Sequence, residues 1–298
     1  MELRQLVYFD AVVRHGGFTR AAEHLHTAQP GISAQIRQLE SELGVTLLAR
    51  TTRQVRLTDA GQRFLTRTRR ILDEVHGSIS DMAELTGVLT GRVRIGTVEA
   101  LDPLDLPGAL AAFHDQHPGV EVILRPSPTG QQLLNDLDNY ETDVALGPTP
   151  VGIPDRFATV QLFSEELVII TGPNHQLTPR HGGVTFAALR DERFVSFPRS
   201  TGLRRILDTA ASPAKFVPHV PYESTSLTQI RDLVSSGLGI ALVPTSVVTA
   251  PGKPVIAHPV RPDPIQRAIA LTHRKDPPLP AAVQACQTLL QRWPSGNA

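Results

Sequence analysis

The stretch AAEHLHTAQPGISAQIRQLE, residues 21–40, decides the architecture of the N-terminal region, because two helical patterns meet in it at a Gln-Pro-Gly sequence. Residues 21–25 carry a narrow apolar stripe of about two helical turns. Residues 26–28 leave room only for a tight turn, and Pro30 then lies near the first position of a new helix, where its missing N–H costs nothing. The apolar stripe of this new helix is Ile32, Ile36, Leu39 and Leu43. The stretch therefore predicts two helices joined by a short turn.

The polar residues of the second helix suit contact with DNA. Gln29, Ser33, Gln35 and Arg37 lie off the apolar stripe on its first turns. In a helix-turn-helix these turns enter the major groove, where Gln and Arg bind base edges and Ser binds bases or phosphate. The alternative is an ordinary exposed polar face. The short turn before the helix and the basic charge of the region favour DNA.

The net charge of zero conceals an asymmetry along the chain. Residues 1–70 contain eleven arginines and six acidic residues, a net charge of +5, so the remaining 228 residues carry −5. A basic head attracts the phosphate backbone of nucleic acid, whereas an acidic remainder repels it. We expect the two parts of the chain to have different partners.

The flanking residues complete a small domain. A first helix is predicted over residues 3–13 and ends at Gly16-Gly17, and Thr19 can cap the second helix. After Gly44, VTLLARTTRQVRLTDAG alternates as two short strands around Arg53-Gln54, the pattern of a wing. Three arginines would then lie where a wing touches the DNA backbone or minor groove: Arg50, Arg53 and Arg56.

Residues 1–60 resemble the winged helix-turn-helix of LysR-type transcriptional regulators, in the string F-x-x-V, G-x-F-T-x-A-A-x-x-L, Q-P-x-I-S-x-Q-I-x-x-L-E-x-x-L-G and R-x-x-R-x-V-x-L-T-x-A-G. The resemblance implies a double-stranded DNA operator as partner. Ala34 stands where many members carry Arg, which removes one expected contact. The residues that we expect to bind DNA are Thr19, Arg20, Gln29, Pro30, Gly31, Ser33, Gln35, Arg37, Arg50 and Arg53.

A long helix is predicted over residues 59–89, with Thr58 as its cap. Apolar residues in it alternate at spacings of three and four, which is typical of the seam of a coiled coil. In the family that the chain resembles this helix dimerises, so we expect a homodimer and further association to a homotetramer. The expected seam contains Leu65, Leu72, Val75, Ile79 and Met82.

From Gly91 the pattern changes to alternating strands and helices. Strands are expected in RVRIGTV, VEVILRP and TDVALG, and helices in LPGALAAFHDQHPG and TGQQLLNDLDNY. This order predicts an α/β domain with mostly parallel strands. It is similar to the LysR effector-binding domain, which has the two-lobed architecture of periplasmic solute-binding proteins.

The resemblance implies a multidomain protein of three parts. These are a mainly helical winged helix-turn-helix head (1–58), a linker helix (59–90) and a two-lobed α/β effector-binding domain (91–298). Lobe one would hold residues 91–161 and 268–298, and lobe two would hold 162–267. The crossovers would lie near 160–162 and 265–267. A small molecule bound between the lobes would control operator binding or activation, through DNA bending or recruitment of RNA polymerase.

Helices that follow loops at this cleft offer free N–H groups and positive dipole ends, which favour a small organic anion. The alternative for each Ser or Thr there is an ordinary helix cap. Ala100 stands where the family often has Ser or Thr, and the neighbouring Glu99 adds negative charge. The residues expected to bind the effector are Thr97, Val98, Glu99, Thr129, Pro148, Phe197, Pro198, Ser200, Thr201, Thr225 and Pro244.

Other functions fit the sequence less well. Catalytic motifs such as G-x-S-x-G and the phosphate-binding loop are absent, and His114 and His117 lack a third metal ligand, so we expect neither an enzyme nor a metal or cofactor. The lone Cys286 is expected in the core and excludes an intrachain disulfide and cysteine-based peroxide sensing. Without a leader or a membrane-spanning stretch we expect a cytoplasmic protein. The alternative function is a cytosolic ligand-binding protein of the periplasmic-binding type without gene regulation.

Overall fold

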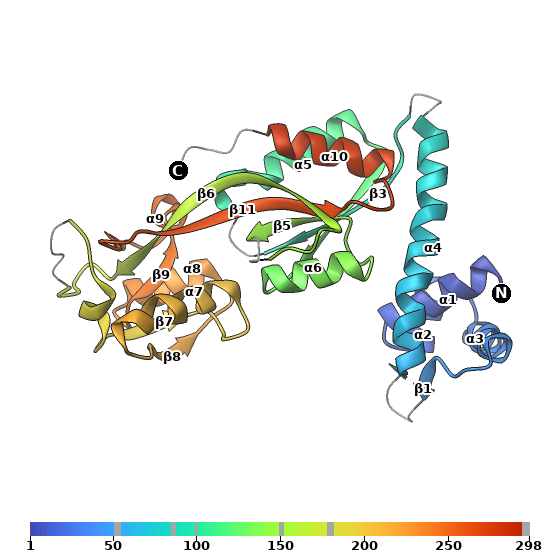
Figure 1. The fold of residues 1–298 in the computed structure, drawn as a ribbon, viewed down its shortest axis with the longest axis horizontal. Coiled ribbons are helices and arrows are strands. Elements are labelled where there is room, and N and C mark those ends of the chain that lie inside the picture. Colours follow the sequence, from blue (N-terminus) through green and yellow to red (C-terminus); the bar gives the residue numbers. More distant parts are fainter. Residues whose placement is uncertain (51–54, 85–87, 99–100, 149–151, 178–181, 294–298) are drawn as a thin grey trace.

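The computed structural model describes residues 1–298 except 51–54, 85–87, 99–100, 149–151, 178–181 and 294–298. Figure 1 shows a helical head beside one long helix, α4, and a body of two lobes arranged in a row. Strands β6 and β11 run through both lobes. The head and lobe two therefore lie at opposite ends of the molecule.

The head is a three-helix unit with a short hairpin. Its elements are α1 (Leu3–Arg14), α2 (Phe18–His24), α3 (Gln29–Leu43), β1 (Leu48–Arg50) and β2 (Val55–Leu57). The apolar stripes predicted from the sequence meet in one core, where Phe9, Ile32 and Ile36 are fully buried. Strands β1 and β2 pair antiparallel, with Leu48 opposite Leu57, which confirms the predicted hairpin.

Of two predicted helix ends in the head, one is confirmed and one is wrong. Helix α3 ends at Gly44, whose left-handed φ of 69° suits glycine at a C-terminal cap, as the sequence predicts. The prediction that Thr19 caps α2 is wrong, because α2 begins at Phe18 with Gly17 at the cap position. Helix α2 thus begins earlier than the sequence indicated.

Helix α4 (Asp59–Glu84) links the head to the body. Thr58 caps it as predicted, since its Oγ1 accepts a hydrogen bond from the Gly61 N–H at 3.0 Å. A Cβ added at Gly61 would lie 2.1 Å from the Leu47 carbonyl oxygen. The start of α4 can therefore pack against the hairpin only because residue 61 is glycine.

The body is built on one seven-stranded sheet in the order β10-β6-β11-β5-β3-β4, with β9 also paired to β6. Its strands are β3 (Gly91–Thr97), β4 (Val120–Pro126), β5 (Val144–Pro148), β6 (Phe157–Thr171), β9 (Ala241–Pro244), β10 (Ile256–Pro259) and β11 (Ile265–Arg274). Among the strand pairs that the structure describes in this sheet, β3–β4 and β3–β5 are parallel and the other four are antiparallel. The expectation of mostly parallel strands is wrong, because the two strands that cross between the lobes run antiparallel to their neighbours.

Each lobe has its own core and its own helices. Lobe one packs α5 (Leu106–Gln116), α6 (Gly130–Asp138) and α10 (Ala281–Arg292) on its part of the sheet. Lobe two holds the parallel pair β7 (Arg193–Ser196) and β8 (His219–Glu223) with α7 (Gly202–Ala211), α8 (Leu227–Ser235) and α9 (Ser246–Thr249). Short 3-10 helices cover Asp102–Leu104, Phe186–Leu189 and Ser212–Ala214. The two lobes meet where β6 and β11 cross.

Candidate functional sites

The N-terminus of α3 is exposed on the surface of the head. Gln29, Pro30 and Gly31 are exposed, and a Cβ added at Gly31 would meet nothing within 4 Å. The cap residue Ala28 is extended, and no described side chain caps the helix end. The positive end of the helix dipole is thus presented to solvent, which suits a phosphate or a base edge.

The next turns of α3 correct one prediction. Arg37 is exposed, as expected, but Ser33 is buried, with 7% of its surface exposed. The Nη1 of Arg37 donates to the Oγ of Ser33 at 3.0 Å. Ser33 therefore orients the guanidinium of Arg37. The sequence pattern predicted an outward-facing Ser33, because position 33 lies directly beside the apolar stripe of the helix.

The other head residues predicted to bind DNA divide into three groups. Thr19 and Arg20 are exposed on α2, and the Arg20 Nη2 donates to the Gly16 carbonyl at 2.8 Å. Gln35 is half-buried, and its Oε1 is buried without a partner among the described residues. The side chain of Arg50 and all of Arg53 fall outside the described part of the chain.

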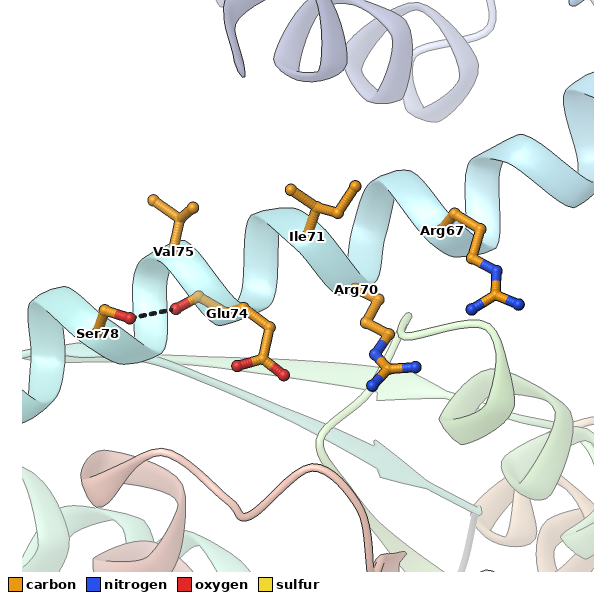
Figure 2. A pocket seen from close by; sticks show the side chains of 6 residues that line it. All are labelled: Arg67, Arg70, Ile71, Glu74, Val75 and Ser78. Atoms are coloured by element: carbon orange, nitrogen blue, oxygen red, sulfur yellow. Dashed lines mark hydrogen bonds between the residues drawn. The ribbon is translucent and has the colours of Figure 1, made fainter. Parts of the chain in front are cut away.

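A second candidate interface lies along α4. Figure 2 shows Ile71 and Val75 projecting from the same side of the helix, beside an open groove lined by Arg67, Arg70, Ile71, Glu74, Val75 and Ser78. Further along α4, Ile79 and Met82 are 62% and 61% exposed. An apolar stripe this long is costly in water unless another surface covers it.

The expected seam of α4 is divided in the structure. Leu65 is 4% exposed and belongs to the core of its own head. Leu72 is 9% exposed, whereas Val75, Ile79 and Met82 face outward or partly outward. Including Leu65 and Leu72 in an intermolecular seam was wrong, because spacing shows which residues share a helix face but not which chain covers it.

The cleft between the lobes holds a cavity of about 220 Å³. Lobe one, lobe two and the crossover strand β11 all contribute to it. Its walls are Val98, Pro126, Ser127, Pro128, Thr129 and Pro148 from lobe one, Phe197, Thr201, Gly202, Leu203, Ile206 and Thr225 from lobe two, and Arg267 from β11. The lining is mainly apolar with a few polar groups, as in sites for small organic ligands.

Two helix N-termini open onto this cleft. The Thr129 Oγ1 caps α6 by accepting from the Gln132 N–H at 3.0 Å, and the Thr201 Oγ1 caps α7 by accepting from the Arg204 N–H at 3.4 Å. Both threonines are therefore caps as well as cleft residues. Their helix ends supply positive dipoles on opposite walls of the cavity.

The lobes also contact each other directly in the cleft. The Gly202 N–H, at the start of α7, donates to the Pro128 carbonyl at 3.3 Å. On the crossover strands, buried Arg267 and Glu165 lie opposite each other in register, with the Arg267 Nε donating to the Glu165 Oε1 at 2.8 Å. The cleft is thus narrow, and the charge of Arg267, which lines it, is balanced by a carboxylate.

Six of the predicted effector residues line the cavity: Val98, Thr129, Pro148, Phe197, Thr201 and Thr225. The cavity does not include Thr97, Pro198, Ser200 or Pro244, and Glu99 lies outside the described residues. Pro244 is buried at the end of β9, opposite Leu167. The cap of α8 is Ser226 and not Thr225.

Seven cavity residues were missed by the sequence analysis: Pro126, Ser127, Pro128, Gly202, Leu203, Ile206 and Arg267. Pro126 is the last residue of the parallel strand β4, and Ser127 and Pro128 follow it directly. Ligands gather beyond the carboxyl ends of such strands, so this signal was available. The sequence around Arg267 carries no such signal, because a charged residue within a strand pattern predicts an exposed side chain.

Cys286 lies in the core of lobe one and is fully buried. Burial raises the pKa of its thiol to about 12. Thiolate is the reactive form, so this cysteine is inert at neutral pH. Within the described residues no group of three or more His, Cys, Asp or Glu side chains is placed to hold a metal, and no helix is long and apolar enough to cross a membrane.

Comparison with known families accounts for almost the whole chain. Residues 3–62 match the family described as "Bacterial regulatory helix-turn-helix protein, lysR family". Residues 86–294 match the family described as "LysR substrate binding domain". Residues 63–85, between the two matches, hold most of α4.

Individual proteins are similar over most of their length. The DNA-binding transcriptional dual regulator OxyR of Escherichia coli is 33% identical, over 94% of this chain and 91% of that protein. The transcriptional dual regulator GltC of Bacillus subtilis is also 33% identical, over 83% and 81%. Among solved structures, a full-length OxyR variant of Pseudomonas aeruginosa gives a TM-score of 0.75 at 24% identity and 100% coverage of both chains. CbnR in complex with its target DNA gives 0.68 at 24% identity, over 98% and 99%.

Proposed function

The chain belongs to the LysR family of transcriptional regulators, and we propose that it binds a two-fold operator under the control of a small organic acid held between its lobes. It is a regulator with an effector-binding domain, not an enzyme. We place its action in the cytoplasm, where DNA and RNA polymerase are accessible to it.

The proposed DNA interface is the exposed start of α3. Gln29, Pro30 and Arg37 face solvent there, next to an uncapped helix end in a head of net positive charge. A solved relative of the same fold, CbnR, is described in complex with its target DNA. In this protein Arg37, oriented by Ser33, would read a base edge, and the wing arginines Arg50 and Arg53 would contact the backbone.

A dimer through α4 would present two recognition helices. The exposed stripe of Ile71, Val75, Ile79 and Met82 supplies the apolar surface for such pairing. Two heads held in this way would occupy successive major grooves, roughly 34 Å apart. We propose that the dimers associate further to a tetramer.

The chemistry of the cleft limits the effector. A cavity of about 220 Å³ is smaller than the ~300–1,000 Å³ of sites for drug-sized molecules, so the ligand is compact. Prolines, Phe197, Leu203 and Ile206 favour an apolar body. The two helix ends at Thr129 and Thr201 favour one anionic group. A small aromatic or branched aliphatic monocarboxylate meets all three conditions.

Thiol oxidation is not the proposed signal, although similar proteins are named hydrogen peroxide-inducible genes activators. The chain has one cysteine, so a disulfide within one chain is impossible. Cys286 is also buried, with a raised pKa that disfavours the thiolate. We therefore propose that the signal is a ligand bound in the cleft and not oxidation of a thiol.

The single observation that carries the proposal is the convergence of two capped helix N-termini on one cavity between the lobes, in a chain whose other end exposes a recognition helix. Footprinting on the DNA upstream of the protein's own gene, with a panel of small carboxylates and aromatics, tests it. We expect two protected half-sites whose pattern changes when one compound is added. Absence of protection at low salt, where about five or more phosphate contacts bind strongly, would refute operator binding.

A further inference from the structure

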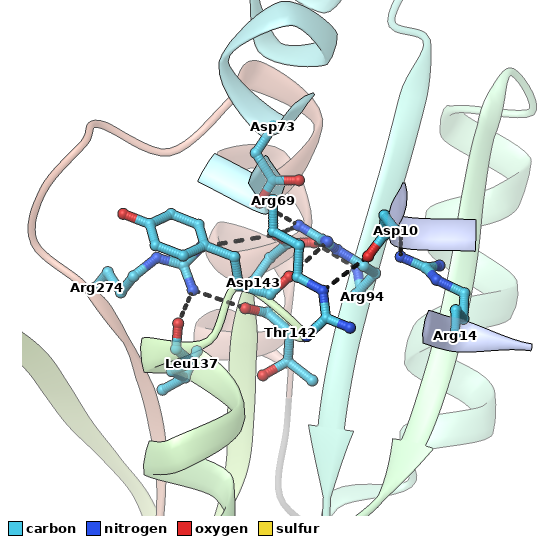
Figure 3. Close-up of polar contacts among 10 residues, drawn as sticks. Asp10, Arg14, Arg69, Asp73, Arg94, Leu137, Thr142, Asp143 and Arg274 are labelled. Atoms are coloured by element: carbon cyan, nitrogen blue, oxygen red, sulfur yellow. Dashed lines mark hydrogen bonds and ion pairs between the residues drawn. The ribbon is translucent and has the colours of Figure 1, made fainter. Parts of the chain in front are cut away.

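The head, α4 and lobe one meet in a buried cluster of ion pairs, called the junction below; Figure 3 shows its members except Glu141. Most of these side chains are buried, although the sequence pattern marks none of them as functional. The members of the junction are Asp10, Arg69, Asp73, Arg94, Glu141, Asp143 and Arg274. They come from α1, α4, β3, the loop before β5, and β11.

Arg69 bridges the head and the effector domain from the middle of α4. Its Nε donates to the Asp10 Oδ1 on α1 at 2.9 Å, and its Nη1 donates to the Glu141 Oε1 in lobe one at 2.7 Å. The side chain is only 8% exposed. One turn earlier on α4, the Thr66 Oγ1 donates to the Asn139 Oδ1 at 3.3 Å. One guanidinium fork thus holds a carboxylate from each side of the interface.

One turn further along α4, a second contact ties the linker to lobe one. The Arg94 Nη2 donates to the Asp73 Oδ2 at 2.7 Å and to the Asp143 Oδ1 at 2.6 Å. The Arg94 Nη1 donates to the Tyr140 carbonyl at 2.9 Å. Arg274 completes the group by donating to the Thr142 carbonyl at 2.8 Å, with its guanidinium 4.1 Å from the centre of the Tyr140 ring.

The elements that carry the junction also reach the cleft. Helix α6 is capped by the cavity residue Thr129 and ends at Asp138, two residues before Tyr140. Asp143 precedes β5, which ends at the cavity residue Pro148, about 17 Å away along an extended strand. Strand β11 carries Arg267 in the cavity and Arg274 in the junction. Lobe one therefore connects the two sites through rigid elements.

Buried ion pairs of this kind favour discrete arrangements. If the head turned away from lobe one, Arg69 or its two carboxylates would lose their partners and need water in their place. Intermediate orientations would keep the charges desolvated but unpaired, which is the most costly case. On these grounds we expect two low-energy arrangements of the junction: the closed one of this structure, with its ion pairs formed, and an open one with hydrated charges.

We propose that Arg69 is a positioning residue that clamps the DNA-binding head onto lobe one, so that the orientation of the head depends on whether the junction is closed. The clamp is a property of the single chain, so it stands whether or not the cleft binds a small acid. In an operator-bound assembly it would make head spacing sensitive to any movement of lobe one.

Distance measurement by pulsed electron paramagnetic resonance tests the clamp. Nitroxide labels are placed at Glu23→Cys on α2 and Gln131→Cys on α6, both exposed positions, while buried Cys286 stays unlabelled. Labelled chain is diluted into an excess of unlabelled chain so that only the distance within one chain is read. The full-length protein is used without DNA or ligand.

The wild type is expected to show a peak at the head-to-lobe distance of the closed junction. Arg69→Met, and Glu141→Gln as the milder variant at the more exposed end, should reduce the fraction of that peak or shift it. Arg92→Gln is the matched control, since it breaks an exposed 2.7 Å pair with Glu121 on the same lobe and should change nothing. Circular dichroism must show a folded chain for each variant.

Two results would overturn the proposal. One is a wild-type distribution without the closed-junction peak. The other is a closed-junction fraction that is the same in Glu141→Gln, Arg69→Met and the wild type. A lack of operator binding or of any response to a ligand would refute the proposed function but would leave the distance result, and so the clamp, intact.

Discussion

At the scale of single residues, Arg37 concentrates the proposed recognition of DNA. It is exposed on α3, and its guanidinium is oriented by buried Ser33. Arg37→Ala should weaken operator binding by about 1–3 kcal/mol, or roughly 5- to 150-fold in Kd, if the guanidinium contacts a base. Fluorescence anisotropy with operator DNA measures this loss.

A matched control for Arg37 is Arg292→Ala, which removes an exposed arginine from the last turn of α10 in lobe one. It should leave operator affinity unchanged. Equal affinities of wild type and Arg37→Ala would remove Arg37 from the interface. A loss of the same size in Arg292→Ala would mean that general charge and not a specific contact is being measured.

Cys286 makes stability depend on pH in alkaline solution. In the unfolded chain a thiol titrates near 8.5, whereas burial raises the pKa of Cys286 to about 12 in the folded protein. Between these values the folded state keeps a proton that the unfolded state loses, so the free energy of unfolding falls as pH rises, by at most about 1.4 kcal/mol per unit.

Urea unfolding of the wild type and Cys286→Ala, at several pH values from neutral to alkaline, isolates this contribution. We expect the wild type to lose more stability than Cys286→Ala over that range. Parallel curves for the two proteins would show that the thiol is not shielded. In the wild type at neutral pH, iodoacetamide should label Cys286 only after unfolding.

The residue scale also shows where sequence reasoning ends. Thr129 and Thr201 could be placed at the cleft because they begin helices that follow strands. Arg267 and the junction arginines could not, because their partners lie far away in the chain: Arg69 binds Glu141, 72 positions later. Charge pairing over such separations leaves no periodic signal.

At the scale of elements, α4 combines two interfaces on one helix. Leu65 in its first half packs into the head of the same chain, whereas Ile79 and Met82 in its second half are exposed. Ile79→Glu places a charge in the proposed dimer seam and should cost at least ~2 kcal/mol in association, because two carboxylates would be desolvated. Analytical ultracentrifugation over a range of concentrations should show more monomer.

Thr228→Glu is the control for Ile79→Glu, because it introduces the same charge at an exposed position of α8 in lobe two, away from α4. It should leave association unchanged. If Ile79→Glu also left association unchanged, the chains would pair through another surface. The clamp by Arg69 would be unaffected by that outcome.

Leu65, on the same helix, should behave differently. It is buried in the head core, so Leu65→Ala should destabilise the protein by about 2–4 kcal/mol through the cavity it leaves. Thermal unfolding measures this, and the association constant of the folded protein should not change. A loss of association without a loss of stability would instead place Leu65 in the seam between chains.

At the scale of the whole molecule, the order of elements was predictable and their pairing was not. The helices of the head, the wing and the strand-helix succession from Gly91 follow from periodicity and caps. The antiparallel pairing of β6 with β11 could not be predicted from a local pattern. Residues 157–171 and 265–274 pair only because the chain comes back from lobe two to lobe one about 100 residues later. The direct contact of the lobes at Gly202 and Pro128 depends on the same return.

For a ligand to regulate this protein, its binding in the cleft must be thermodynamically coupled to the binding of DNA by the head. A ligand changes operator binding only if it binds the DNA-competent arrangement with a different affinity from the other arrangement. The coupling is reciprocal, so the operator must change the affinity of the cleft by the same factor. This property distinguishes a regulator from a ligand-binding protein that merely carries a DNA-binding head.

A panel of small monocarboxylates is first screened for the compound that most raises the Tm of the protein. The most direct test is then calorimetric titration of that compound into the free protein and into the operator-bound protein. The account predicts dissociation constants that differ by at least about fivefold, a coupling of ~1 kcal/mol. Equal constants for the free and the operator-bound protein would contradict it.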